Sequence, residues 1–311
     1  MPTLPTFDAT ATAALLDFEA LVDALSVAAQ EHDAGQIRSP VRTALPLNEG
    51  GVLLSMPASA HDIAIHKLVS VCPRNAARDM PTIFGAVTVC DATTGKPEFI
   101  LDGPTVTGRR TAALSMLGVK LLHPSAPRTF LLIGTGQQAR FHAAAIGALH
   151  QGAKIFVKGR TPSSEQAFCE QMAREGIAVA ALAQVSAGGP IPDDIDTVVA
   201  ATTSKVPVYT DGAKASRLVI GVGAFTPDAA EIAAETVRAS RVFVDDFAAA
   251  KEEAGDLLQA GVDWTVVRSL GSIVGGEVRK DQPIVFKTVG SGAWDLAACR
   301  VARAAAARTK D

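Results

Sequence analysis

The spacing of hydrophobic positions divides the chain into two parts with different element patterns. The first part opens with apolar residues at the i, i+3, i+4, i+7 spacing of a helix, at Phe18, Leu21, Val22 and Leu25. Runs rich in Val, Ile and Phe then predict strands, at 52–56, 63–71, 82–90 and 98–101. Because no helical spacing separates these strands, we expect an antiparallel or mixed sheet, followed by a helix from Thr105 to Leu122.

Beyond Pro124 and Pro127, the pattern changes to strands that alternate with helices. Strands are predicted at 129–133, 154–157, 196–201, 218–222 and 242–245. Such alternation is typical of a parallel doubly wound sheet with helices on its faces. The sequence therefore predicts the α/β class for this part of the chain.

The alanine-rich end of the chain, 293–307, predicts a helix that we expect to pack on the first part. The pattern thus predicts two domains. One is a Rossmann-type domain at 125–292, and the other is an α+β domain formed by 1–124 and 293–311. A chain of 311 residues is long enough for two such cores.

Composition narrows the classes of partner and compartment. Hydrophobic residues make up 48% and charged residues 20%, as in ordinary α/β proteins, and the net charge is −3. That charge gives no general attraction to nucleic acid or to an anionic membrane. No signal peptide is evident, and no apolar run is long enough to span a bilayer. The four cysteines and six histidines lack metal-ligand spacing, so we expect a cytoplasmic protein without a metal.

A glycine-rich turn follows the apolar strand that ends at Ile133. It reads Gly134-Thr135-Gly136-Gln137-Gln138-Ala139 and leads into a helix. In this Gly-x-Gly-x-x-Ala pattern, the glycines let backbone N–H groups approach a pyrophosphate at the helix N-terminus. An ordinary β–α turn is the alternative, but the strand before and the helix after favour dinucleotide binding.

The end of the next strand indicates which dinucleotide binds. NAD enzymes usually carry an acidic residue there, which holds the ribose hydroxyls. This chain instead has Lys158, Arg160 and Thr161, which offer donors to a 2′-phosphate. A solvated surface arginine is the alternative. We favour NADPH, with NADH possible.

Two later strand ends carry groups suited to the same crevice. Thr202, Thr203 and Ser204 follow one strand, and Gly223 follows the next. In a doubly wound sheet these ends line the ligand site. The hydroxyls are predicted to contact ribose or nicotinamide, although each could equally cap a loop.

The strand at 63–71 places a lysine among apolar residues. Side chains alternate between faces along a strand, so Lys67 shares a face with Ile65 and Val69, while His66 points the other way. A lysine in that position must extend its amine to solvent, meet a buried carboxylate or serve a ligand. We favour a functional role for Lys67 and a structural or surface role for His66.

Two arginines add to this charge. Arg110 lies on the apolar stripe of the helix after Pro104, near its N-terminus, whereas Arg109 lies off the stripe and is expected to be solvated. Arg42 precedes the first strand. Arg42, Lys67 and Arg110 together would bind a carboxylate.

At these residues the chain resembles the ornithine cyclodeaminase/mu-crystallin family over nearly its whole length. The matching motifs are Pro40-Val41-Arg42-Thr43, Met56-Pro57, Lys67-Leu68-Val69-Ser70, Asn75, Gly108-Arg109-Arg110-Thr111-Ala112-Ala113, the Gly134 turn, Thr202-Thr203-Ser204, Gly223-Ala224, Pro227-Asp228, Glu231, Phe286-Lys287, Gly290 and Asp295-Leu296. The resemblance implies a homodimer built through the first domain. It also implies that the three cations bind the carboxylate of an amino or imino acid beside the nicotinamide.

Within the family, the chain is more similar to the ketimine reductases than to the cyclodeaminases. Cyclodeaminases carry an acidic residue where this chain has Phe225, which would instead form an apolar wall for a ring. The resemblance also implies that Met56 contacts the substrate and Gly290 the cofactor. The expected reaction is NADPH-dependent reduction of Δ1-pyrroline-2-carboxylate to L-proline or of Δ1-piperideine-2-carboxylate to L-pipecolate, in proline metabolism or lysine degradation.

Lys67 is the candidate proton donor to the imine nitrogen, because burial beside cations promotes loss of its proton. Asp228 is the rival, as a carboxylate that stabilises the iminium, although it could instead cap a helix from residue 229. Three alternative functions remain: an ornithine cyclodeaminase, an alanine dehydrogenase-type enzyme, and a crystallin-like protein that binds NADPH without catalysis.

Overall fold

The computed structural model describes residues 3–182 and 190–308. Contacts divide the chain into two compact units. The terminal unit consists of Met1–Thr111 with Ser291–Asp311, and the central unit is Ala112–Gly290. The sequence predicts the boundary after residue 124, at the prolines, whereas the contacts place it inside the helix α3 (Gly103–Leu122). One continuous helix therefore belongs to both units.

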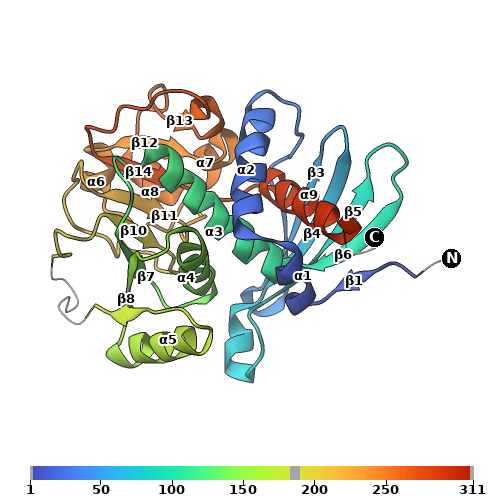
Figure 1. The fold of residues 1–311 in the computed structure, drawn as a ribbon, viewed down its shortest axis with the longest axis horizontal. Coiled ribbons are helices and arrows are strands. Elements are labelled where there is room, and N and C mark those ends of the chain that lie inside the picture. The colour runs from blue at the N-terminus through green and yellow to red at the C-terminus, as the bar shows by residue number, and fades with distance from the viewer. Residues whose placement is uncertain (1–2, 183–189, 309–311) are drawn as a thin grey trace. The chain divides into compact units, whose positions relative to one another are not determined.

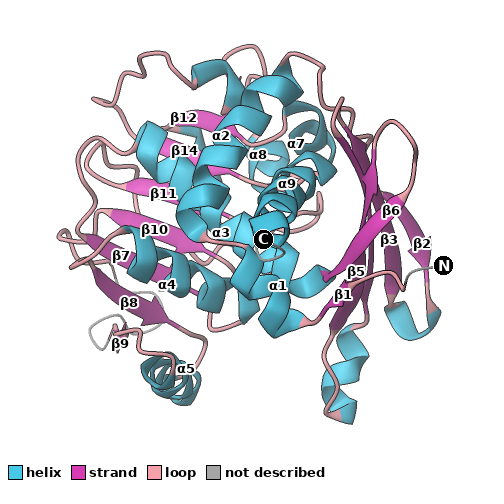
Figure 2. Ribbon diagram, turned by 45° about the vertical axis from the view of Figure 1, so that its right-hand side comes forward, coloured by secondary structure: helices cyan, strands magenta, loops and turns pink. Residues whose placement is uncertain are grey.

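The terminal unit contains a six-stranded sheet in the order β1-β6-β5-β4-β3-β2 (Figures 1 and 2). Its strands are β1 (Thr6–Phe7), β2 (Thr43–Pro46), β3 (Val52–Ser59), β4 (Ile63–Val71), β5 (Ile83–Asp91) and β6 (Pro97–Asp102). The ladders from β2 to β6 are antiparallel, and β1 joins β6 in parallel. The predicted strands of this part are confirmed, and β1 and β2 are additional.

Helices cover one face of this sheet. They are α1 (Ala9–Leu15), α2 (Phe18–Asp33) and α9 (Gly292–Arg308), and α9 contacts α2, β3 and β4. Short 3-10 turns at Asn48–Gly50 and Pro73–Arg78 connect the strands. The predicted C-terminal helix is confirmed. Its first residue, Gly292, lies close to β3, where a Cβ on it would be only 3.0 Å from Pro57 O.

The central unit is an eight-stranded parallel sheet in the order β13-β12-β14-β11-β10-β7-β8-β9 (Figure 2). Its strands are β7 (Thr129–Ile133), β8 (Lys154–Lys158), β9 (Ala180–Ala181), β10 (Thr197–Ala200), β11 (Leu218–Gly221), β12 (Arg241–Val244), β13 (Arg268–Ser269) and β14 (Ile284–Lys287). The order reverses between β7 and β10, which is the switch point of a doubly wound sheet. The predicted fold class is confirmed, and β9, β13 and β14 are additional strands.

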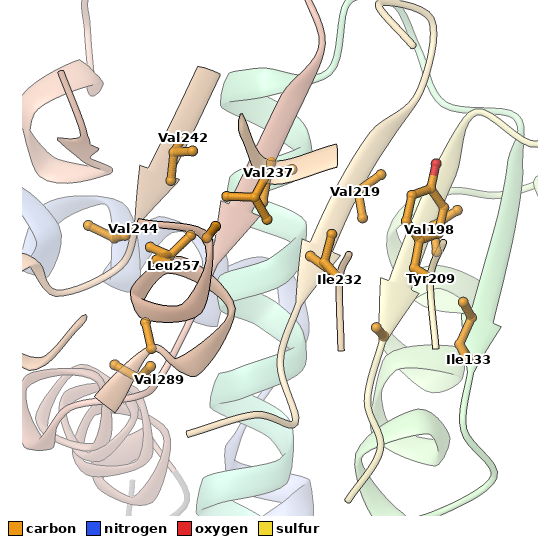
Figure 3. Close-up of a cluster of buried hydrophobic side chains, with 14 of the residues drawn as sticks. Ile133, Val198, Tyr209, Val219, Ile232, Val237, Val242, Val244, Leu257 and Val289 are labelled. Atoms are coloured by element: carbon orange, nitrogen blue, oxygen red, sulfur yellow. The ribbon is translucent and has the colours of Figure 1, made fainter. Parts of the chain in front are cut away.

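Helices and loops cover the central sheet. They include α4 (Gln137–Leu149), α5 (Pro162–Arg174), α6 (Ala234–Arg238), α7 (Phe247–Glu253), α8 (Gly255–Ala260) and a 3-10 turn at Gly271–Ile273. Figure 3 shows part of its core, where Val198 and Val219 from neighbouring strands face Tyr209 and Ile232. All four residues of β10 are buried, as expected for a parallel strand covered on both faces. Within the described residues, no helix is both long and apolar enough to cross a bilayer.

Two local expectations are wrong. Arg109 is half-buried rather than solvated, because its Nε donates to Leu16 O at 2.7 Å and its guanidinium lies 4.0 Å from the centre of the Phe18 ring. No helix begins at residue 229 either. The next helix is α6, and its N-cap is Ala233, so Asp228 caps no helix.

Candidate active site

Lys67 lies in the middle of β4 and points into the terminal unit. Its side chain is only 2% exposed, and its Nζ lies 2.5 Å from Oδ2 of Asp295 and 3.4 Å from Oγ1 of Thr107. Asp295 belongs to the first turn of α9 and is fully buried. The carboxylate therefore supplies the partner that a buried lysine needs.

The same carboxylate binds a second cation. Nε of Arg110, on α3, donates to Oδ1 of Asp295 at 3.0 Å, and both side chains are buried. Arg42 is half-buried, and its positive charge acts on Lys67. The site therefore combines three cations, at Arg42, Lys67 and Arg110, with the carboxylate of Asp295. An excess of positive charge remains, which suits an anionic ligand.

Burial sets the proton affinity of Lys67. The loss of solvent lowers the pKa of its amine to about 8; Asp295 opposes this fall, and Arg110 and Arg42 add to it. Burial alone would raise the pKa of Asp295, but the charges of Lys67 and Arg110 and their hydrogen bonds hold it below the usual 3.8. Near neutral pH, the site thus contains a fixed carboxylate and an ammonium group able to release a proton.

The other predicted substrate residues fall in different parts of the chain. Met56 is buried on β3 directly opposite Lys67 in the ladder, so the two side chains share the inner face of the sheet. Phe225 and Asp228 belong to the central unit, where Phe225 is 43% exposed. Asp228 accepts hydrogen bonds from Lys205 Nζ at 2.6 Å and Thr226 Oγ1 at 2.7 Å, and these donors lower its pKa.

The glycine turn after β7 has the geometry of a dinucleotide cradle. Gly134 has a φ of +118°, and a Cβ on it would lie 2.5 Å from Ala201 O, so a side chain is excluded there. Gly136 is the N-cap of α4, where a Cβ would meet open space and no side chain caps the helix. The N–H groups of the first turn, at Gln137, Gln138 and Ala139, are thus available to an anion. The residues present fit a dinucleotide pyrophosphate.

The end of β8 contains one group that the sequence did not suggest. Arg160 is exposed, and Thr161 caps α5 by accepting from Ser164 N at 3.2 Å. Glu165, from the first turn of α5, accepts from Gly159 N at 2.8 Å. A carboxylate therefore lies at this strand end, although it belongs to the helix that follows the strand.

Three of the remaining predicted cofactor residues, Thr202, Gly223 and Gly290, donate to buried carboxylates. Thr202 donates to Glu231 through its N–H and its hydroxyl, and Gly223 donates to the same side chain. Gly290 N donates to Asp245 Oδ2 at 2.9 Å. Thr203 is exposed, and the Ser204 hydroxyl donates to Val206 O at 2.7 Å.

Sequence reasoning assigned no role to Asp295, Glu231 or Asp245, although it expected Lys67 to need a partner. Asp295 stands between Trp294 and Leu296 in an apolar helix, and all three side chains are fully buried. An acidic residue inside such a run is the signal that could have identified it, because an unpaired carboxylate is costly to bury.

The fold is that of a dinucleotide-binding enzyme, and the terminal unit contains a buried cluster of cations around one carboxylate. The chain belongs to the ornithine cyclodeaminase/mu-crystallin family, and the sequence model of that family matches residues 7–310. It is 56% identical over 303 residues to Δ1-pyrroline-2-carboxylate reductase 1 of Burkholderia multivorans, covering 97% of this chain and 96% of that protein. It is 54% identical to the Δ1-pyrroline-2-carboxylate/Δ1-piperideine-2-carboxylate reductase of Azospirillum brasilense, covering 98% and 96%.

A solved structure has the same fold. It is the Δ1-pyrroline-2-carboxylate reductase of Thermococcus litoralis, in complex with NADH and L-proline. The TM-score is 0.87 at 24% identity, and the match covers 99% of this chain and 98% of that one. The expected family and fold are therefore confirmed.

Proposed function

We propose that this protein reduces Δ1-pyrroline-2-carboxylate to L-proline, and Δ1-piperideine-2-carboxylate to L-pipecolate, with a nicotinamide cofactor. The observation that carries the proposal is the buried cluster of Lys67, Arg110 and Asp295, with Arg42 beside it. It supplies a carboxylate-binding group and a proton donor, which are the two functions that such a substrate requires. Two relatives that share more than half of this sequence are named Δ1-pyrroline-2-carboxylate reductases, and the name of the second adds Δ1-piperideine-2-carboxylate.

In the proposed complex, Arg110 and Arg42 bind the substrate carboxylate. Asp295 engages the Nε of Arg110, and the two terminal nitrogens of that guanidinium make no hydrogen bond to the described residues. These nitrogens form the planar pair that binds a carboxylate bidentately. Asp295 thus holds the arginine in place without occupying its binding edge.

Lys67 delivers the proton in this proposal. An ammonium with a pKa of about 8 can protonate the imine nitrogen, and the iminium carbon then becomes the better hydride acceptor. The bound nicotinamide would supply the hydride. Asp228 is the weaker candidate for a catalytic role, since it is exposed and already paired with Lys205.

The pH dependence of the reaction tests this role of Lys67. Because the protonated amine is the active form, we expect kcat/KM to be level below pH 8 and to fall about tenfold per pH unit above it. Stopped-flow rates between pH 6 and 10 would measure the profile, and cofactor affinity over the same range is the control. A level profile to pH 10 would exclude Lys67 as the donor.

For the cofactor we propose NADPH, because Glu165, the carboxylate at the end of β8, already accepts from Gly159 N, whereas Arg160 is exposed. Arg160 makes no hydrogen bond or ion pair to the described residues, and it stands just before the N-terminus of α5, where the hydroxyls of Thr161 and Ser163 lie 3.0 Å apart. A 2′-phosphate would be bound by the guanidinium, the hydroxyls and the positive end of the helix dipole.

Replacing Arg160 with alanine tests the cofactor preference. Loss of a hydrogen bond to a charged group is worth about 1.5–3 kcal/mol, so KM for NADPH is expected to rise at least about tenfold. KM for NADH is expected to stay unchanged. Arg174→Ala, an exposed arginine in the last turn of the same helix, is the matched control. An equal effect on both cofactors would refute 2′-phosphate recognition by Arg160.

We also propose that the protein is a homodimer, formed through the outer face of the terminal sheet. The ladder places Leu45, Leu53, Leu68 and Phe84 on that face, and Leu45, Leu68 and Phe84 are 56%, 42% and 47% exposed. Several exposed apolar side chains on one face of a sheet are typical of a protein interface.

Phe84→Glu is expected to convert the dimer to a monomer, because it would bury a charge in the interface. Analytical ultracentrifugation measures the result. Val266→Glu changes a single valine, 71% exposed, in the central unit, and is expected to leave the assembly as it is. A Phe84→Glu protein with the mass of the wild type would exclude this face.

A panel of substrates separates the proposal from its alternatives. We expect oxidation of the reduced cofactor with either cyclic ketimine. Ammonia release from ornithine would indicate a cyclodeaminase, and turnover of pyruvate with ammonia would indicate an alanine dehydrogenase. Tight cofactor binding without any turnover would indicate a crystallin-like binding protein.

A further inference from the structure

Glu231 is a fully buried carboxylate that joins the ends of two neighbouring strands in the central unit. Its Oε1 accepts from the N–H and the hydroxyl of Thr202, at 2.6 and 2.8 Å. Its Oε2 accepts from the N–H groups of Gly223 and Ala224, at 2.5 and 3.1 Å. Backbone N–H groups can only donate, so in three of these four bonds the Glu231 side chain is the acceptor, which is the role a carboxylate takes.

The hydrogen bonds to Glu231 come from uncharged donors, three backbone N–H groups and one hydroxyl. Within residues 3–182 and 190–308, no lysine or arginine forms an ion pair with Glu231. Lys287 is buried close by, but its Nζ lies 2.8 Å from Oδ2 of Asp256, which is equally buried. Asp256 Oδ1 in turn accepts from the N–H groups of Glu231 and Ile232, at 2.6 and 2.8 Å. Lys287 and Asp256 neutralise each other, and Glu231 keeps an uncompensated charge.

The strand ends are built around this carboxylate. A Cβ on Gly223 would lie 2.0 Å from Thr202 O and 2.7 Å from Glu231 Oε1, so only glycine permits the close approach. Thr202 and Gly223 follow β10 and β11, at the carboxyl edge of the parallel sheet beside its switch point. Doubly wound sheets bind their nucleotides at that edge. Burying a charge that has no ion-pair partner costs free energy. A role in binding the cofactor would explain why a carboxylate is kept at this edge.

We propose that Glu231 is a positioning residue for the nicotinamide end of the cofactor, and that its charge favours the oxidised ring. The inference rests on the nicotinamide-dependent function proposed above. The oxidised ring carries a positive charge and the reduced ring carries none. A fixed anion in a poorly solvated site lowers the free energy of the cationic form only. The same attraction favours hydride donation, since positive charge develops on the ring as the hydride leaves.

Binding measurements on Glu231→Gln test the charge separately from activity. Isothermal titration calorimetry gives the dissociation constants of the oxidised and reduced cofactors. We expect the ratio of the oxidised to the reduced constant to rise on the order of tenfold. Glu235→Gln is the matched control, because it removes the same charge from a side chain that is 84% exposed nearby in sequence. Its ratio is expected to equal that of the wild type.

Glu231→Asp separates the effect of the charge from the effect of the hydrogen bonds that join the two strand ends. The shorter side chain keeps its charge but loses reach, so both cofactors are expected to bind more weakly while their ratio stays constant. A folded Glu231→Gln protein with the wild-type ratio would overturn the proposal. So would a Glu231→Asp protein whose ratio shifts as far as that of Glu231→Gln.

Wild-type protein decides the matter if Glu231→Gln does not fold. The oxidised cofactor is then expected to gain more affinity from its ring than the reduced cofactor, relative to the same nucleotide without nicotinamide. The reverse order would overturn the proposal. Wild-type protein that binds neither cofactor overturns this inference and the proposed function together. Wild-type protein that binds both but reduces no ketimine overturns the proposed reaction alone, and the ratio still tests Glu231.

Discussion

Lys67→Met is expected to lower kcat/KM for Δ1-pyrroline-2-carboxylate by about three orders of magnitude. General acid catalysis contributes about 10²–10⁴ in rate, and methionine keeps the length of the buried stem but carries no proton. Arg110 still neutralises Asp295 in this variant, through the 3.0 Å hydrogen bond. We therefore expect the protein to fold and to bind the cofactor with wild-type affinity, which fluorescence titration checks.

The neighbouring residue provides the control for this variant. His66 lies on the opposite face of β4, where it is exposed and bonded to Ser55 at 2.9 Å. His66→Ala is expected to keep near-normal turnover. If Lys67→Met is folded and retains more than about a tenth of the activity, proton donation by Lys67 is refuted.

Asp295→Ala is expected to reduce the free energy of unfolding by about 3–5 kcal/mol. This is the usual effect of removing one partner of a buried ion pair. The side chains of Lys67 and Arg110 are 2% and 5% exposed, and the substitution leaves both cations without their carboxylate. Urea unfolding followed by circular dichroism measures the loss.

A milder change at the same position tests how the charge of Asp295 affects the pKa of Lys67. Asp295→Asn keeps an acceptor for Arg110 but removes the charge that holds the pKa of Lys67 up, so the alkaline fall in activity should move below pH 8. Asp281→Ala, in an exposed ion pair with Arg279, is expected to leave the urea midpoint unchanged. An Asp295→Ala protein as stable as Asp281→Ala would show that the buried cluster does not stabilise the fold.

The local sequence pattern was enough to predict the fold class and the buried position of Lys67. The two-residue period of 63–71 placed Lys67 on the buried face, and the structure confirms that position, with Ile65 and Val69 buried beside it. The glycine turn was equally visible, because its strand, turn and helix are contiguous in sequence. Features set by a few consecutive residues can be read without the tertiary structure.

Features set by distant residues could not be predicted. Lys67 and Asp295 meet only because α9 returns to the first sheet, and Arg109 is half-buried only because Phe18 of α2 lies beneath it. Glu231 accepts hydrogen bonds from backbone N–H groups at two strand ends. Every residue except proline has such a group, so the pattern of side chains does not indicate which ones Glu231 binds. Strands β9 and β13 have two residues each, too few for a period to emerge.

The central claim is that this protein transfers a hydride to the ring carbon of a cyclic ketimine carboxylate. Purified protein given Δ1-pyrroline-2-carboxylate and NADPH deuterated at C4 of the nicotinamide tests it most directly, with chiral separation and mass spectrometry of the product. The prediction is L-proline with deuterium at Cα, formed in a one-to-one ratio to the cofactor consumed. Absence of proline, or proline without deuterium from cofactor labelled on either face, would contradict the account.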